Sequence, residues 1–102
     1  MKVKIPKEIK IGSHNYRVKY KPFLSKDSGF RGTIEHRLQE IWIDPENPPS
    51  QRDATLLHEG LHLISTVFSC SLDDDAIDRV AEGLAEFLFN NLGIEFDWSE
   101  IE

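Results

Sequence analysis

The sequence predicts an α+β fold, in which a small antiparallel β-sheet of three to four strands is followed by two helices. Three observations lead to this prediction. Residues 8–44 alternate apolar and polar side chains with a period of two, residues 51–68 and 72–92 repeat apolar side chains at helical spacing, and a proline-rich segment separates the two parts. The chain has 102 residues, so we expect a single domain with one core over residues 1–102.

The strands are expected between residues 8 and 44. Ile9 and Ile11 alternate with charged residues, and the aromatic and β-branched residues of 16–20 do the same. Residues 12–15 supply a turn between these two strands. Residues 24–31 are expected to form a loop, and residues 32–36 and 39–44 to form a second hairpin.

Three prolines within residues 45–49 end the last strand, because proline cannot continue a ladder or a helix interior. Ser50 is expected to cap the first helix, over about residues 51–68, and Ser71 the second, over about residues 72–92. Gly93 is a natural residue to end the second helix. The alternation in residues 94–98 suggests a short strand or a docked extension.

Charge and composition restrict the classes of function. The formal net charge of −6 opposes binding to phosphate backbones, so nucleic acid is not the expected partner. No apolar run approaches the roughly 20 residues of a membrane span, and the first residues lack the apolar region of a secretory signal. The single cysteine, Cys70, fits a reducing compartment, so a cytoplasmic location is expected.

The five residues His58-Glu59-Gly60-Leu61-His62 form an HExxH motif inside the first expected helix. Residues four apart lie on one face of a helix, so the two histidines can share a zinc ion (Zn2+). Glu59 lies about 100° further round the helix, where it can act as a general base on a metal-activated water. The alternative for so short a motif is two ordinary histidines on an amphipathic helix. The helical context and the small residues on the histidine face favour the metal site.

Two histidines leave a catalytic zinc one protein ligand short. His62 is the last histidine in the chain, so the third ligand is a carboxylate or comes from earlier in the sequence. Asp78, Glu82 and Glu86 form one stripe on the second helix by their i, i+4 spacing. A solvated acidic face is the alternative for this stripe.

The spacing His58-Glu59-x-x-His62…Glu82 resembles the gluzincin arrangement of thermolysin-like metallopeptidases. The run IWIDP…RDATLLHEGLHLIS…DRVAEGLAEFLFNNLG looks like small phage-type metallopeptidases, which are minimal zincin-like proteins. The resemblance covers roughly residues 32–93. It implies that Glu82 is the third zinc ligand. Glu86 or Asp78 is the alternative third ligand, or the acceptor for the other ring N–H of a ligand histidine.

The same resemblance implies an edge strand beside the metal helix that pairs with extended substrate, and residues 39–44 are the candidate. A plain sheet edge is the alternative. A peptidase also needs a donor for the oxyanion of its tetrahedral intermediate. The candidates that the sequence leaves open are His14, Tyr16, Tyr20, His36 and Arg79.

The sequence therefore predicts a zinc-dependent metallopeptidase that hydrolyses peptide bonds in a peptide or protein substrate. His58, His62 and Glu82 are expected to bind zinc, and Glu59 to be the catalytic general base. The first alternative is a non-catalytic zinc-binding regulatory or protein-interaction domain. The second is an interaction module without metal.

Overall fold

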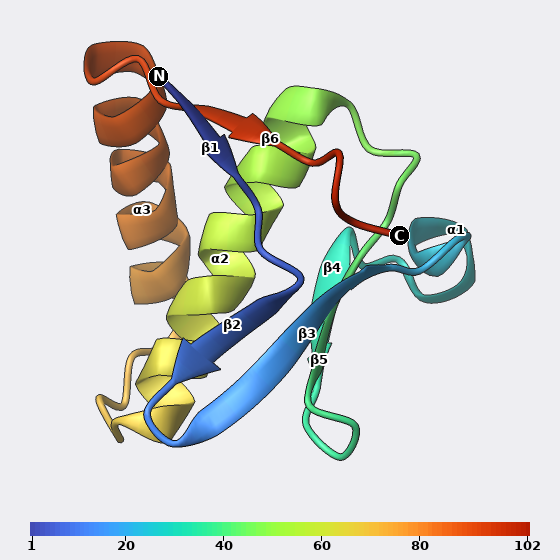
Figure 1. The fold of residues 1–102 in the computed structure, drawn as a ribbon. Coiled ribbons are helices and arrows are strands. Elements are labelled where there is room, and N and C mark those ends of the chain that lie inside the picture. The colour runs from blue at the N-terminus through green and yellow to red at the C-terminus, as the bar shows by residue number, and fades with distance from the viewer.

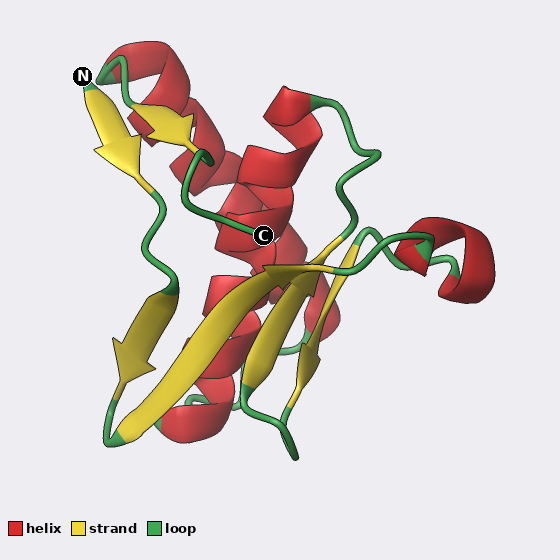
Figure 2. Cartoon of the chain, turned by 45° about the vertical axis from the view of Figure 1, so that its right-hand side comes forward, coloured by secondary structure: helices red, strands yellow, loops and turns green.

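The computed structural model describes all residues, 1–102, and contains a four-stranded sheet with its two long helices on one side (Figures 1 and 2). The α+β fold class and the number of strands are as the sequence predicts. The sheet strands lie within residues 8–44, and they are β2 (Glu8–Ile11), β3 (His14–Tyr20), β4 (Gly32–Glu35) and β5 (Glu40–Ile43).

The sheet has the strand order β2-β3-β5-β4, which corrects the prediction of an antiparallel sheet. The pairs β2–β3 and β4–β5 are antiparallel hairpins, but β3 and β5 pair in parallel. The chain leaves β3, forms the short helix α1 (Leu24–Ser28) where a loop was expected, and returns along the far edge as β4. The second hairpin therefore docks with β5, not β4, against β3.

The core lies between the sheet and the first long helix, α2 (Pro49–Val67). Tyr16 and Val18 of β3 are buried, whereas the alternate residues between and beside them are exposed. Ile41 and Ile43 of β5 are fully buried on the same side. Each strand therefore has one face toward α2, as its period of two predicts.

Helix α2 begins two residues before the expected start, and Ser50 is not its N-cap. The cap position is Pro48, without a side-chain hydrogen bond, and Pro49 occupies the first turn. Proline suits that turn because its fixed φ is helical and its missing N–H would have no partner there. The helix buries Leu56, Glu59 and Leu63.

The second long helix, α3 (Asp74–Ala85), starts later than expected, and its N-cap is Asp73, not Ser71. The Asp73 carboxylate accepts a hydrogen bond from the Ala76 N–H at 2.7 Å. The wider turns of a π-helix, η1 (Glu86–Asn91), continue α3 toward Gly93, whose φ is +67°. The second helical segment thus ends close to the predicted residue.

Two further strands join the beginning and end of the chain. β1 (Lys2–Lys4), which was not expected, pairs in parallel with β6 (Glu95–Asp97), the predicted tail strand. After β6, Trp98 and Ile101 are buried in the main core. Among the helices, none combines the length and the apolar character that a membrane crossing requires.

Candidate metal centre

The two histidines of the motif converge on one another. They lie one turn apart on α2, and their Nε2 atoms are 3.0 Å apart. Two nitrogen ligands at 2.0–2.1 Å from a tetrahedral zinc would be about 3.3–3.4 Å apart. The rings therefore already have nearly the separation that a shared ion requires, with the same nitrogen of each ring directed to the shared point.

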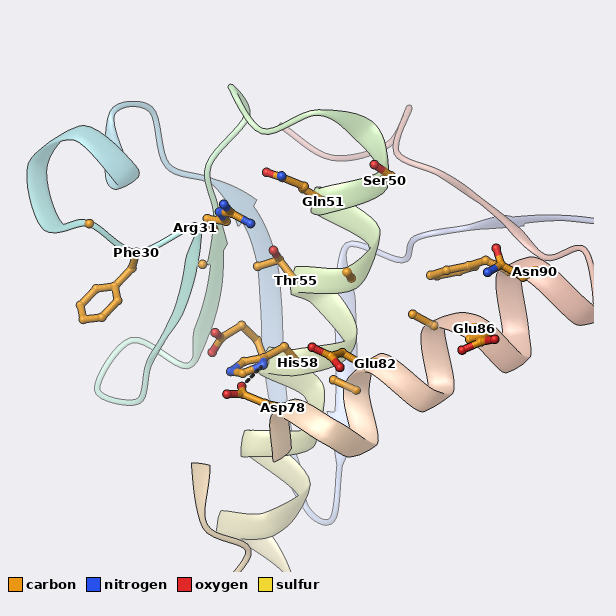
Figure 3. A pocket seen from close by; sticks show the side chains of 17 residues that line it. Phe30, Arg31, Ser50, Gln51, Thr55, His58, Asp78, Glu82, Glu86 and Asn90 are labelled. Carbon is orange, nitrogen blue, oxygen red and sulfur yellow. Dashed lines mark ion pairs between the residues drawn. The ribbon is translucent and has the colours of Figure 1, made fainter. Parts of the chain in front are cut away.

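Asp78 of α3 contacts the other ring nitrogen of His58, the one that does not face His62. Its Oδ1 is 3.2 Å from His58 Nδ1, as the dashed line in Figure 3 marks. An N–H on Nδ1 that donates to this carboxylate leaves the lone pair of the neutral ring on Nε2, the atom that faces His62. The contact therefore prepares His58 to bind a metal through Nε2.

Glu59 is buried, with 9% of its surface exposed, and it forms no ion pair with His58 or His62. It shares the buried side of α2 with Leu56 and Leu63, but it also lines the hollow beside His58. Burial raises the pKa of the Glu59 carboxyl to about 7. A carboxyl group with a pKa near neutrality can both accept and return a proton, as general acid–base catalysis requires.

The electrostatics around His62 favour its neutral form. Burial lowers the pKa of His62 first, the neighbouring His58 lowers it further, and the carboxylates of Asp74 and Asp78 act in the opposite direction. The net effect is a lowered pKa. A neutral imidazole is the form that binds a metal ion, so His62 suits that role at neutral pH.

No third His, Cys, Asp or Glu side chain joins the two histidines closely enough to form a three-ligand group. Glu82 is exposed and lines the same hollow as His58, one turn beyond Asp78 on α3. Glu86 lines the hollow as well but lies one turn further along, in η1 (Figure 3). Of the three carboxylates on the stripe, Asp78 contacts a histidine directly, and Glu82 is the next nearest along the helix.

Two hollows meet at this site and together form what we call the cleft. The first, of about 720 Å³, follows α2 toward Ser50, and α3 and η1 toward Asn90. The second, of about 460 Å³, extends to His36 and Thr66. The residues that line both are Phe30, Gly32, His58, Glu59 and Asp78. The histidines thus lie near the middle of a continuous depression.

The strand beside the cleft is β4, not the expected strand at residues 39–44. β5 (Glu40–Ile43) pairs with strands on both sides, so it has no free edge. β4 is the last strand of the sheet, and its residues Gly32, Thr33 and Ile34 line the second hollow. The prediction was wrong because the parallel docking of the second hairpin places its first strand outside.

Of the five candidate donors for an oxyanion, His36 alone lines the cleft. The Tyr20 hydroxyl accepts a hydrogen bond from Arg52 at 2.8 Å, and the Tyr20 ring stacks on Trp98. His14 contacts Gln39 at the turn end of the sheet. Phe30 and Arg31, which sequence reasoning missed, line the cleft from the loop before β4 (Figure 3). No local pattern indicates them, since loop residues lack periodicity.

The comparisons with known proteins give one match. The Peptidase_M78 family model, described as the IrrE N-terminal-like domain, matches residues 11–95. This range runs from the end of β2 to the start of β6 and contains every residue of the candidate site. No curated protein and no solved structure matches the chain.

Proposed function

The chain belongs to the Peptidase_M78 family of IrrE N-terminal-like domains, and from this premise we propose that it is a zinc-dependent metallopeptidase of the HExxH gluzincin type. The observation that carries the proposal is the convergence of the His58 and His62 Nε2 atoms at 3.0 Å, with Asp78 on the other nitrogen of His58. The resemblance to small phage-type enzymes remains part of the proposal.

In the proposed site, His58, His62 and Glu82 hold the zinc ion. When bound, zinc makes a water acidic near neutral pH and polarises the scissile carbonyl. Glu82 is exposed on α3 and lines the same hollow as His58, and the proposal requires its side chain to turn toward the histidines. Glutamate with two histidines is an established ligand set for catalytic zinc.

Glu59 is the proposed general base and then acid. Its side chain is buried and lines the same hollows as His58, and burial raises the pKa of its carboxyl to about 7. It accepts a proton from the attacking water and delivers that proton to the leaving amine. Nothing else on α2 is placed for this role, because Leu56 and Leu63 are the other buried residues of the helix.

The proposed substrate is a peptide in an extended conformation. The cleft continues on both sides of His58 and Glu59, so it offers room for residues before and after the scissile bond. β4 has a free edge that lines the cleft, and a free strand edge can add a peptide strand through main-chain hydrogen bonds.

A non-catalytic zinc-binding domain is the second candidate function. The observation that favours it is that no third ligand joins the two histidines. If Glu82 never completes the site, the two histidines are left as a weak, incomplete zinc site that can serve regulation without hydrolysis. This candidate and the peptidase differ in the role of Glu59.

The deciding experiment uses zinc-loaded wild-type protein and the Glu59→Gln variant. Zinc content is measured by mass spectrometry of the intact complex, and hydrolysis by mass spectrometry of products from a diverse peptide mixture. We expect one zinc per chain in both proteins and a loss of hydrolysis of about 100-fold or more in the variant. Equal hydrolysis by both proteins, or none by either, would reject the peptidase proposal.

A further inference from the structure

His36 and Tyr16 form a pair at the end of the cleft that the proposed zinc site does not use. The Tyr16 hydroxyl lies 2.9 Å from His36 Nδ1, and the two rings meet edge to face with centroids 5.9 Å apart. Tyr16 belongs to the core, with 5% of its surface exposed. His36 is exposed and directly follows the last residue of β4. The buried Tyr16 side chain thus fixes the position of the exposed His36 ring through a hydrogen bond.

The direction of this hydrogen bond follows from what each group can donate. The Tyr16 hydroxyl has no partner other than His36. If the ring donated to the phenol oxygen, the hydroxyl proton would have no partner in the protein at this part-buried contact, which is unfavourable. The Tyr16 hydroxyl therefore donates to Nδ1. The proton of the neutral His36 ring is then on Nε2, which has no partner in the protein.

The position of His36 gives the free Nε2–H its proposed use. The edge strand β4 ends at Glu35, and its residues line the same hollow as His36 and His62. If a peptide pairs with the edge of β4, the main-chain N–H groups of β4 can donate to it only as far as the end of the strand. The His36 ring is the next donor along that edge, one residue further on.

We propose that His36, fixed in its Nε2–H tautomer by Tyr16, donates a hydrogen bond to a main-chain carbonyl of the bound peptide on the His62 side of the cleft. The inference rests on the proposed peptidase function and assigns this chain a substrate-binding residue beyond the zinc site. Because main-chain carbonyls occur in every peptide, His36 contributes to the affinity for extended chains without selecting a side chain.

The first test measures the tautomer. Long-range proton–nitrogen NMR spectra of the full-length, nitrogen-15-labelled protein report which ring nitrogen of His36 carries the proton at a pH where the ring is neutral. We expect the Nε2–H form in the wild type and a shift toward a mixture of both forms in Tyr16→Phe. An Nδ1–H ring in the wild type, or identical spectra in the variant, would overturn the pairing.

The second test measures binding in the Glu59→Gln background, where hydrolysis does not interfere. The probe is unfolded, dephosphorylated casein labelled with fluorescein, added to the zinc-loaded protein and followed by fluorescence anisotropy. We expect His36→Ala to weaken binding about three- to tenfold, the effect of one lost hydrogen bond. The matched control is His14→Ala, which removes an exposed histidine from the start of β3, outside the cleft.

The outcomes separate the two proposals. If the Glu59→Gln protein binds casein and His36→Ala binds it equally well, the role of His36 is refuted while the peptide cleft stands. If the Glu59→Gln protein itself does not bind casein, the peptide cleft fails and the role of His36 fails with it. An equal loss in His36→Ala and His14→Ala would also count against the inference, since it would indicate a nonspecific effect of charge or stability.

Discussion

At the scale of single residues, Asp78 and Glu82 illustrate how two similar carboxylates acquire different roles. Both lie on α3, one turn apart, and line the same hollow as His58. Asp78 contacts His58 Nδ1 at 3.2 Å, on the side of the ring away from His62. In the proposed site this contact makes Asp78 an orienting residue, and the third ligand position is assigned to Glu82.

This division predicts two different defects in zinc binding. Asp78→Asn should keep one zinc per chain but weaken affinity about 10- to 100-fold, because the amide holds the ring less well. Glu82→Gln should lose tight binding altogether, because a ligand is missing. Competition with a fluorescent zinc chelator measures both affinities.

The control for these variants is Asp75→Asn, which removes the same charge from α3 at an exposed residue that does not line the cleft. Its zinc affinity should match that of the wild type within about twofold, an effect of general charge alone. If Asp78→Asn abolishes binding while Glu82→Gln retains it, the two roles are exchanged and Asp78 is the ligand.

At the scale of elements, the approach of β4 to α2 determines the width of the cleft. Gly32 in β4 is buried, and a Cβ atom built on it would lie 2.5 Å from Thr55 Cγ2 of α2 and 3.1 Å from the Trp42 carbonyl oxygen of β5. A side chain at this position has no space between strand and helix. Glycine is therefore required for the close approach of the edge strand to α2.

We predict that Gly32→Ala destabilises the protein by about 1–3 kcal/mol, because strand and helix must separate to admit the methyl group. Thermal and urea unfolding measure the effect. The matched substitution is Gly83→Ala in α3, where an added Cβ meets no atom within 4 Å. There alanine should stabilise the helix by about 1 kcal/mol. Equal stability changes in the two variants would contradict the proposed contact.

At the scale of the whole molecule, the sheet separates two environments. One face packs on α2 and forms the core, whereas Glu40 is buried on the other face among polar partners. Glu40 accepts hydrogen bonds from the Trp42 indole at 2.8 Å and from Arg17 of β3 at 3.0 Å, and it also pairs with Lys19. This carboxylate joins the parallel strands β3 and β5 at the centre of the sheet.

The environment of Glu40 predicts a dependence of stability on pH. The hydrogen bond from Trp42 lowers the pKa of Glu40 most, burial raises it, and the charges of Lys19 and Arg17 lower it, so that the folded value lies below the ordinary 4.5. A lowered folded pKa stabilises the protein above pH 4.5, and this stabilisation is lost as the pH falls through the folded value.

Glu40→Gln should therefore reduce stability at pH 7, by about 1 kcal/mol, and the difference from the wild type should shrink below pH 4.5. Urea unfolding at a series of pH values measures it. Glu100→Gln, which breaks the exposed pair with Lys4, is the control and should change stability by only a few tenths of a kcal/mol. A constant difference for Glu40→Gln down to pH 3 would contradict the assignment.

The sequence by itself determined the features that depend on neighbours along the chain. The period-two alternation in residues 16–20 correctly identified which side chains of β3 are buried, and the i, i+4 spacing correctly placed His58 and His62 on one helix face. These features follow from backbone geometry, which repeats with the same period in every strand and helix. The family match supports a metallopeptidase-like role for the chain.

Only the tertiary structure decided which elements lie side by side. Nothing local distinguishes β4 from β5 as the edge strand, because a hairpin can dock on β3 through either of its strands. The same holds for the contact of Asp78 with His58 and of Tyr16 with His36, whose partners lie 20 residues apart in each case. Such pairings depend on the packing of the whole core, since their free energy comes from surfaces that meet only after the chain has folded.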